Sequence, residues 1–169
     1  MIAGSTVALR ALERQHLEET RQWANDPELC RLSDRARPVS EMEHEEWFAS
    51  LQSRSDRVYF AIETNDERRH IGNVWLWDID PRHRKAEVRI VIGNPAAAGK
   101  GHGTEAIELA CAYGFDRLNL HRLYAYVLEI NPRARRAFEK AGFVLEGTLR
   151  QDRWFDDRYI DTFLLGRLR

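Results

Sequence analysis

The chain has 169 residues, of which 43% are hydrophobic and 31% charged, a balance typical of a globular protein with one core-forming domain over residues 1–169. Its 26 basic and 27 acidic residues give a net charge of −1, so overall charge favours neither nucleic acid nor a membrane surface as a partner. Cys30 and Cys111 lie outside any metal-binding spacing, and no metal site or disulfide framework is expected. Neither a signal peptide nor a membrane-spanning apolar run is evident, and we expect a cytoplasmic protein.

In the first half of the chain, strand-like and helix-like patterns alternate. The expected elements are a strand at 6–12, helices at 13–24 and 40–51, and strands at 57–63, 70–79 and 85–93. The Asn-Asp-Pro sequence at 25–27 is expected to end the first helix, and residues 28–39 are expected to be irregular. Ser40 and Glu43 form a capping-box pattern that starts the second helix, and Gly72 is expected to mark a bulge.

The second half repeats this alternation. The expected elements are a helix at 103–118, a strand at 121–128, a helix at 131–141, and strands at 143–149 and 159–168. Asn131 and Gly142 suit the beginning and the end of the shorter helix. Cys111 falls on the apolar face of the longer helix, which predicts a packing residue rather than a nucleophile. A turn is expected at Asp156 and Asp157. Strands and helices in this order predict one mixed α/β domain.

A glycine-rich loop joins the strand at 85–93 to the helix that follows it. Gly99, Gly101 and Gly103 leave backbone N–H groups bare where the helix dipole adds partial positive charge. This combination suits a phosphate or pyrophosphate group. A flexible, glycine-rich connection with no ligand is the alternative interpretation.

Two common phosphate-binding patterns do not fit this loop. A Walker loop requires Gly-Lys-Ser/Thr at a set distance, which the sequence lacks. A dinucleotide-binding turn requires Gly-x-Gly-x-x-Gly in an opening βαβ unit, whereas this loop follows the middle of the chain and lacks the third glycine. A nicotinamide-dependent oxidoreductase is therefore disfavoured.

The loop does resemble a different pattern. Ala98-Gly-Lys-Gly-His-Gly-Thr-Glu-Ala106 resembles the pyrophosphate loop of the GCN5-related N-acetyltransferases (GNAT), Gln/Arg-x-x-Gly-x-Gly/Ala, except that Ala98 replaces the first Gln or Arg. Residues 131–143 resemble the second acetyl-CoA-binding segment of that family. The segments at 146–150 and 157–161 match the ending of the branch that includes ribosomal-protein alanine acetyltransferases and spermidine acetyltransferases.

This resemblance implies a fold and a cosubstrate. The fold would be a mostly antiparallel, splayed sheet of about seven strands with helices on both faces. Acetyl-CoA would lie with its pyrophosphate on the N–H groups of residues 99–104 and its pantetheine arm along the free edge of residues 90–92. The residues implied in acetyl-CoA binding are Ile90, Val91, Ile92, Ala98, Gly99, Lys100, Gly101, His102, Gly103, Thr104, Asn131, Ala134 and Phe138. Basic residues that could reach its phosphates, or simply face solvent, are Lys100, Arg135, Arg136 and Lys140.

The same resemblance suggests part of the catalytic chemistry. Acetyl transfer requires a neutral amine, and Glu87 is the candidate base; the alternative is that Glu87 faces solvent or pairs with Arg84 or Arg89. Many relatives protonate the departing thiolate with a tyrosine, but Phe138 stands at that position here. Two other tyrosines could replace it, Tyr126 and Tyr159, or the thiolate could leave to water.

The acceptor site is expected to involve residues 28–50 and the end of the strand at 70–79. An aromatic wall could be formed by Trp47, Trp75 and Trp77. Carboxylates that could meet an ammonium are Asp34, Glu45, Asp78 and Asp80. Residues 34–37 mix charges of both signs and do not form the acidic groove expected for a polyamine.

The predicted function is therefore acetyl-CoA-dependent N-acetyl transfer, directly to a primary amine. The acceptor is left open between a protein N-terminal amine and a small amine such as a polyamine or amino sugar, and homodimer formation is also left open. The alternative is a non-catalytic acyl-CoA-binding or sensory module on the same fold.

Overall fold

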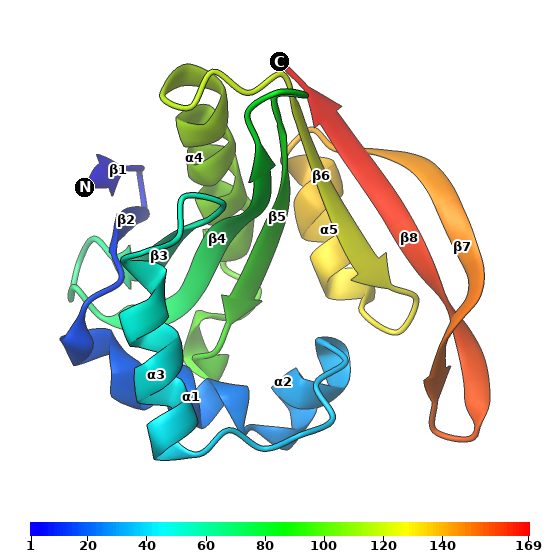
Figure 1. Cartoon of the computed structure of the whole chain (residues 1–169), viewed down its shortest axis with the longest axis horizontal. Helices are drawn as coiled ribbons and strands as arrows, with labels where there is room; N and C mark the ends of the chain where they lie inside the picture. Colours follow the sequence, from blue (N-terminus) through cyan, green and yellow to red (C-terminus); the bar gives the residue numbers. More distant parts are fainter.

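An eight-stranded sheet runs through the computed structural model, which describes all residues 1–169 (Figure 1). Its strands are β1 (Ile2–Ala3), β2 (Val7–Ala11), β3 (Val58–Thr64), β4 (His70–Asp80), β5 (Lys85–Ile92), β6 (Arg122–Leu128), β7 (Val144–Phe155) and β8 (Arg158–Leu168). They lie in the order β1-β2-β3-β4-β5-β6-β8-β7. Only the neighbours β5 and β6 are parallel, so the mixed α/β fold with a mostly antiparallel sheet is confirmed.

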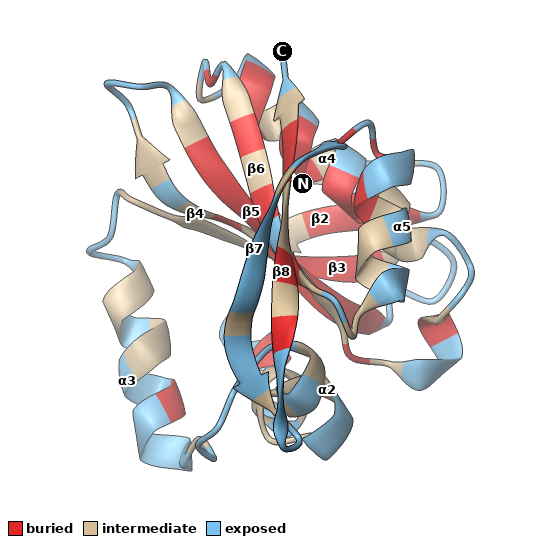
Figure 2. Cartoon of the chain, turned by 90° about the vertical axis from the view of Figure 1, so that its right-hand side faces the viewer, coloured by how far each residue is buried: buried red, intermediate tan, exposed pale blue.

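Helices lie on both faces of this sheet (Figure 2). They are α1 (Leu17–Ala24), α2 (Pro27–Leu32), α3 (Glu41–Leu51), α4 (His102–Asp116) and α5 (Pro132–Lys140). Short 3₁₀ turns, η1 (Arg14–His16) and η2 (Pro95–Ala97), precede α1 and α4. Helices α4 and α5 cover one face, and α1 and α3 lie on the other. None of these helices is long and apolar enough to cross a bilayer.

The main core lies between the sheet and α4. The inward face of α4 includes Ile107 and Cys111, which are fully buried against strand residues such as Leu76 and Leu123. Burial raises the pKa of the Cys111 thiol to about 12, which leaves it protonated and unreactive at neutral pH. Cys111 is therefore a packing residue, as its position in the helical pattern predicted.

Strands β5 and β6 pair over only a short distance. Their parallel register joins Lys85–Glu87 to Arg122–Tyr124, after which the two strands separate (Figure 1). Strand β5 continues to Ile92 while it remains paired with β4 on its other side. From Val88 onward, β5 therefore has a free edge in the middle of the sheet.

The helix ends follow the predicted chemistry. Ser40 and Glu43 form a reciprocal capping box at the start of α3. Asn131 Oδ1 accepts a hydrogen bond from the Ala134 N–H at 3.1 Å, which begins α5. Gly142 follows the end of α5 with a φ of 85°, a conformation that disfavours other residues.

Two sequence-based expectations require correction. Residues 28–39 are not all irregular, because Asp26 caps α2 by accepting a 2.9 Å hydrogen bond from the Leu29 N–H. Strand β7 extends to Phe155, and the pairing shift between Leu149 and Arg153 absorbs the intervening residues as a bulge. The expected sheet of about seven strands is present, with β1 as a short further edge that brings the count to eight. The β3–β4 register shift lies beside Gly72, and the turn at Asp156 and Asp157 is present.

Candidate active site

A cavity of about 910 Å³ begins where β5 and β6 separate. Its wall includes Glu87–Val91 of β5, Tyr126–Leu128 of β6, residues of α5, and side chains from α1, α3 and β4. A volume of this size accommodates a small organic ligand. The split in the sheet thus opens into a space that helices from both faces help to enclose.

The glycine loop lies between β5 and α4. Gly99 and Gly101 have φ angles of 74° and 85°, and a Cβ added to either would meet no atom within 4 Å. No backbone hydrogen bond is donated by the N–H groups of residues 99–104. Six bare donors at the N-terminus of a 15-residue helix form a binding site for an anion.

Glu87 lies at the last position of β5 that pairs with β6, opposite Tyr124. It is buried, and its two carboxylate oxygens accept hydrogen bonds of 2.8 and 2.7 Å from Arg89. Both interpretations considered for this residue are thus compatible with its position, because it lines the cavity and is also paired with Arg89. Arg84 is bonded instead to Asn119.

Helix α5 supplies the opposite side of the split. Asn131, Ala134 and Phe138 all line the cavity, and Phe138 packs edge-on against Phe143 with ring centroids 5.1 Å apart. Phe138 has no hydroxyl group to protonate a thiolate. Both tyrosines considered as substitutes are exposed, but only Tyr126 lines the cavity; Tyr159 packs against Trp154.

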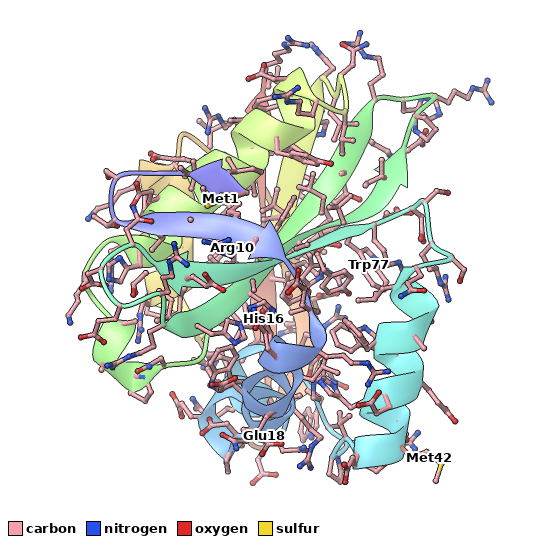
Figure 3. The ribbon with its side chains drawn as sticks, turned by 90° about the vertical axis from the view of Figure 1, so that its left-hand side faces the viewer. Met1, Arg10, His16, Glu18, Met42 and Trp77 are labelled. Carbon is pink, nitrogen blue, oxygen red and sulfur yellow. The ribbon has the colours of Figure 1, made fainter.

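An aromatic wall forms the far side of the cavity, away from the split. The Trp47 ring stacks on His44 at 4.9 Å and meets Tyr59 edge-on at 5.4 Å. Tyr59 in turn stacks on Trp75 at 5.3 Å. Trp77 is not part of this wall; it lies on β4 with the Arg57 guanidinium 3.7 Å from its ring centroid (Figure 3).

A family model described as "Acetyltransferase (GNAT) domain" matches residues 6–144. The chain belongs to the GNAT family. It is an acetyl-CoA-dependent N-acetyltransferase.

Several relatives of this acetyltransferase are spermidine N(1)-acetyltransferases. The Escherichia coli K12 protein is 33% identical over 94% of this chain and 84% of its own length. The Vibrio cholerae protein is 34% identical over 93% of this chain and 90% of its own length. A crystal structure of spermidine N-acetyltransferase from Vibrio cholerae, in complex with CoA and spermine, matches with a TM-score of 0.89 and 32% identity, covering 98% and 96% of the two chains. A dodecameric structure from the same organism matches with a TM-score of 0.82.

In the structure of this GNAT protein, the residues predicted to bind acetyl-CoA fall into two groups. Ile90, Val91, Asn131, Ala134 and Phe138 line the cavity. The others continue from the end of β5 into α4: Ile92, Ala98, Gly99, Lys100, Gly101, His102, Gly103 and Thr104. The bare N–H groups of residues 99–104 suit the pyrophosphate of acetyl-CoA, and they do not depend on the side chain missing at Ala98.

Sequence reasoning missed what anchors the loop in this acetyltransferase. Glu105, in the first turn of α4, accepts hydrogen bonds from the backbone and side chains of Ser5 and Thr6. His102 Nδ1 lies 3.1 Å from the same Thr6 hydroxyl. The N-terminal segment therefore fixes the helix end that presents the loop. A glutamate near a helix N-terminus is a common helix-stabilising choice, so its distant partners left no signal in the sequence.

The carboxylates proposed for the acceptor are mostly elsewhere. Only Asp34 lines the cavity, and it forms a 3.1 Å ion pair with Arg153. Glu45 pairs with Arg14, and Asp80 accepts hydrogen bonds from the backbone of its own turn. Neither Asp80 nor the exposed Asp78 lines the cavity.

Proposed function

We propose that this acetyltransferase transfers the acetyl group of acetyl-CoA directly to the primary amine of a small molecule held in the cavity. One observation carries this proposal: a single cavity extends from the free edge of β5 to the aromatic wall. The cosubstrate and the amine can therefore meet without an acetylated side chain as an intermediate carrier. The names of the spermidine acetyltransferase relatives make a polyamine one of the acceptors to test.

Within this proposal, the bare N–H groups of residues 99–104 bind the pyrophosphate, and the free edge of β5 orients the pantetheine arm. Acetyl-CoA supplies the activated thioester. Asn131 contributes a side-chain amide at the same end of the cavity while its Oδ1 caps α5. The reacting end thus lies between β5 and α5, which restricts the direction from which an amine can approach.

The incoming amine must lose a proton, since an aliphatic ammonium has a pKa of about 10.4 in water. Glu87 is the proposed base, acting directly or through a water molecule. Each of its oxygens has a second lone pair beyond the one used by Arg89, so it can accept the proton while the hydrogen bonds from Arg89 stay in place. The proton for the thiolate comes from Tyr126, the only candidate tyrosine that lines the cavity, or from water.

The test is release of free CoA thiol with a panel of primary amines that includes spermidine, putrescine and an N-terminal alanyl peptide. The expected result is amine-dependent release, with the product identified by mass spectrometry. Binding of acetyl-CoA without turnover on any amine would sink this proposal and favour a non-catalytic acyl-CoA-binding module.

We also propose that the chain self-associates through the β7–β8 hairpin. This hairpin exposes apolar side chains, among them Val144, Leu149 and Trp154, and the dodecameric relative supports an oligomer. Light scattering coupled to size-exclusion chromatography should give a mass above the 19.8 kDa of one chain. A monomer mass at high protein concentration would contradict this.

A further inference from the structure

Two arginines of the loop between α2 and α3, Arg35 and Arg37, lie in the cavity wall without an ion-pair partner. Neither guanidinium takes part in any salt bridge or side-chain hydrogen bond of the structure, whereas nearby Arg31 reaches Asp156 at 3.4 Å. Both are exposed and free to meet a ligand. A guanidinium of this kind binds a carboxylate or a phosphate through two parallel hydrogen bonds.

Every carboxylate that lines the cavity is already engaged. Asp34 is paired with Arg153 at 3.1 Å. Glu43 accepts hydrogen bonds from the Ser40 backbone and hydroxyl at 2.9 and 3.0 Å, and Glu87 is held by Arg89. Glu43 is hydrogen-bonded to the neutral Ser40 and keeps its own negative charge. The lining therefore contains four arginines against three carboxylates, which leaves it with one net positive charge. His44 does not change this sign, because burial lowers its pKa and favours the neutral form.

A buried donor in the same wall also lacks an acceptor. The indole N–H of Trp75 is inaccessible to solvent and makes no hydrogen bond. An indole N–H can only donate, so the group that satisfies it must present an oxygen or another lone pair. This donor lies in the aromatic wall, which can pack against the body of a small acceptor.

We propose that the preferred acceptor is a primary amine that also carries an acidic group, a carboxylate or a phosphate, bound by Arg35 and Arg37. This inference rests on the proposed function and names the substrate class of that same cavity. A linear polyamine brings several positive charges toward two guanidinium groups without an ion pair, and Glu43 is the one lining carboxylate outside an ion pair, so a polyamine is disfavoured electrostatically. The acceptor class thus differs from the one in the names of the spermidine acetyltransferases.

Matched amine pairs test this directly. Ornithine is putrescine with a carboxylate, and O-phosphoethanolamine is ethanolamine with a phosphate. For at least one pair, kcat/KM measured by thiol release should be about tenfold or more higher for the acidic member, a difference of about 1.4 kcal/mol in transition-state binding. The pair with the larger ratio identifies the acidic group as carboxylate or phosphate.

The variants assign the effect to the two arginines. The double variant Arg35→Gln, Arg37→Gln should bring the ratio of kcat/KM for the acidic amine to kcat/KM for its neutral partner close to one, mainly by raising KM for the acidic amine. Its affinity for acetyl-CoA should stay unchanged. Arg31→Gln is the matched control, because Arg31 is an exposed arginine nearby that does not line the cavity, and it should keep the wild-type ratio. Both positions of the double variant are exposed, and an unchanged urea unfolding midpoint will verify that it folds.

Two results would overturn the inference. One is a wild-type enzyme that acetylates putrescine or spermidine more efficiently than both acidic amines. The other is a double variant that keeps the full preference for the acidic member. A different result would show that the proposed function itself is wrong: acetyl-CoA would bind, but no amine would cause thiol release.

Discussion

Replacing Glu105 with glutamine should destabilise the protein, and the loss should depend on pH. The Glu105 carboxylate accepts a 2.6 Å hydrogen bond from the Ser5 hydroxyl and a 3.0 Å bond from the Thr6 N–H, besides those from the Ser5 N–H and the Thr6 hydroxyl. Burial by itself would raise the pKa of Glu105, but these hydrogen bonds outweigh it and lower the pKa to about 2.

The magnitude follows from this shift. Lowering a pKa from its ordinary value of 4.5 to about 2 corresponds to an upper limit of about 3.4 kcal/mol, at about 1.36 kcal/mol per pH unit. Solvent screens this partly exposed carboxylate, and glutamine keeps one acceptor oxygen, so we expect a loss of about 1–2 kcal/mol at pH 7. Because the folded-state pKa is the lower one, the stabilisation is complete above pH 4.5 and disappears as the pH falls toward 2.

Urea unfolding of the wild type and Glu105→Gln between pH 7 and pH 2.5 measures this difference. The gap in unfolding free energy should narrow steadily below pH 4.5. Glu108→Gln is the control, because Glu108 is exposed on the same helix and makes no ion pair or side-chain hydrogen bond. The role assigned to Glu105 would be refuted if the difference in unfolding free energy between wild type and Glu105→Gln stayed constant over this pH range. It would also be refuted if Glu108→Gln lost as much unfolding free energy as Glu105→Gln.

Three further substitutions test the site and the core. Gly103→Val should weaken acetyl-CoA binding, measured by calorimetry, about tenfold or more. It should change stability little, because a Cβ at this position meets only Ile92, at 3.5 Å. Gly103→Ala, which the family pattern allows, is the control, and equal affinity of the two variants for acetyl-CoA would contradict the assignment. Glu87→Gln should lower kcat about 100-fold at neutral pH with acetyl-CoA affinity intact, whereas an unchanged rate at every pH would exclude Glu87 as the base. Leu76→Ala should reduce the unfolding free energy by about 2–5 kcal/mol while activity per folded molecule persists, and a loss below 1 kcal/mol would show that the core closes around the gap.

The sequence predicted the features that depend on neighbouring residues. Ser40, Asn131 and Gly142 cap or end their helices through partners a few positions away, so local patterns were sufficient. The glycine loop could be predicted for the same reason, since bare N–H groups and the start of a helix are both local properties of the chain. One local signal was misinterpreted: Asp26-Pro27 ends one helix and also begins the next.

Features that join distant parts of the chain were missed. Glu105 bonds to residues about a hundred positions away, and neither partner carries a distinctive pattern. Glu63 is buried between Arg10, at 2.6 Å, and His16, at 3.1 Å; Figure 3 labels both of these partners. The pairing of Glu87 with Arg89 was considered, because those residues are two positions apart on one strand. Which tryptophans line the cavity depended on the packing of Trp47 in α3 against Tyr59 in β3, which no local pattern specifies.

The early separation of β5 from β6 gives this protein a strand edge that is enclosed rather than peripheral. Outer edges of sheets can recruit strands of other chains, and proteins normally protect them with charge, bulges or short length. Here the exposed amides of β5 lie inside a cavity, with α5 across the split. The pantetheine arm of acetyl-CoA carries its own amide groups, so it can pair with this edge as a strand would. The split therefore places a strand edge in the middle of the sheet, beside the cavity, where a strand-like cosubstrate can use it.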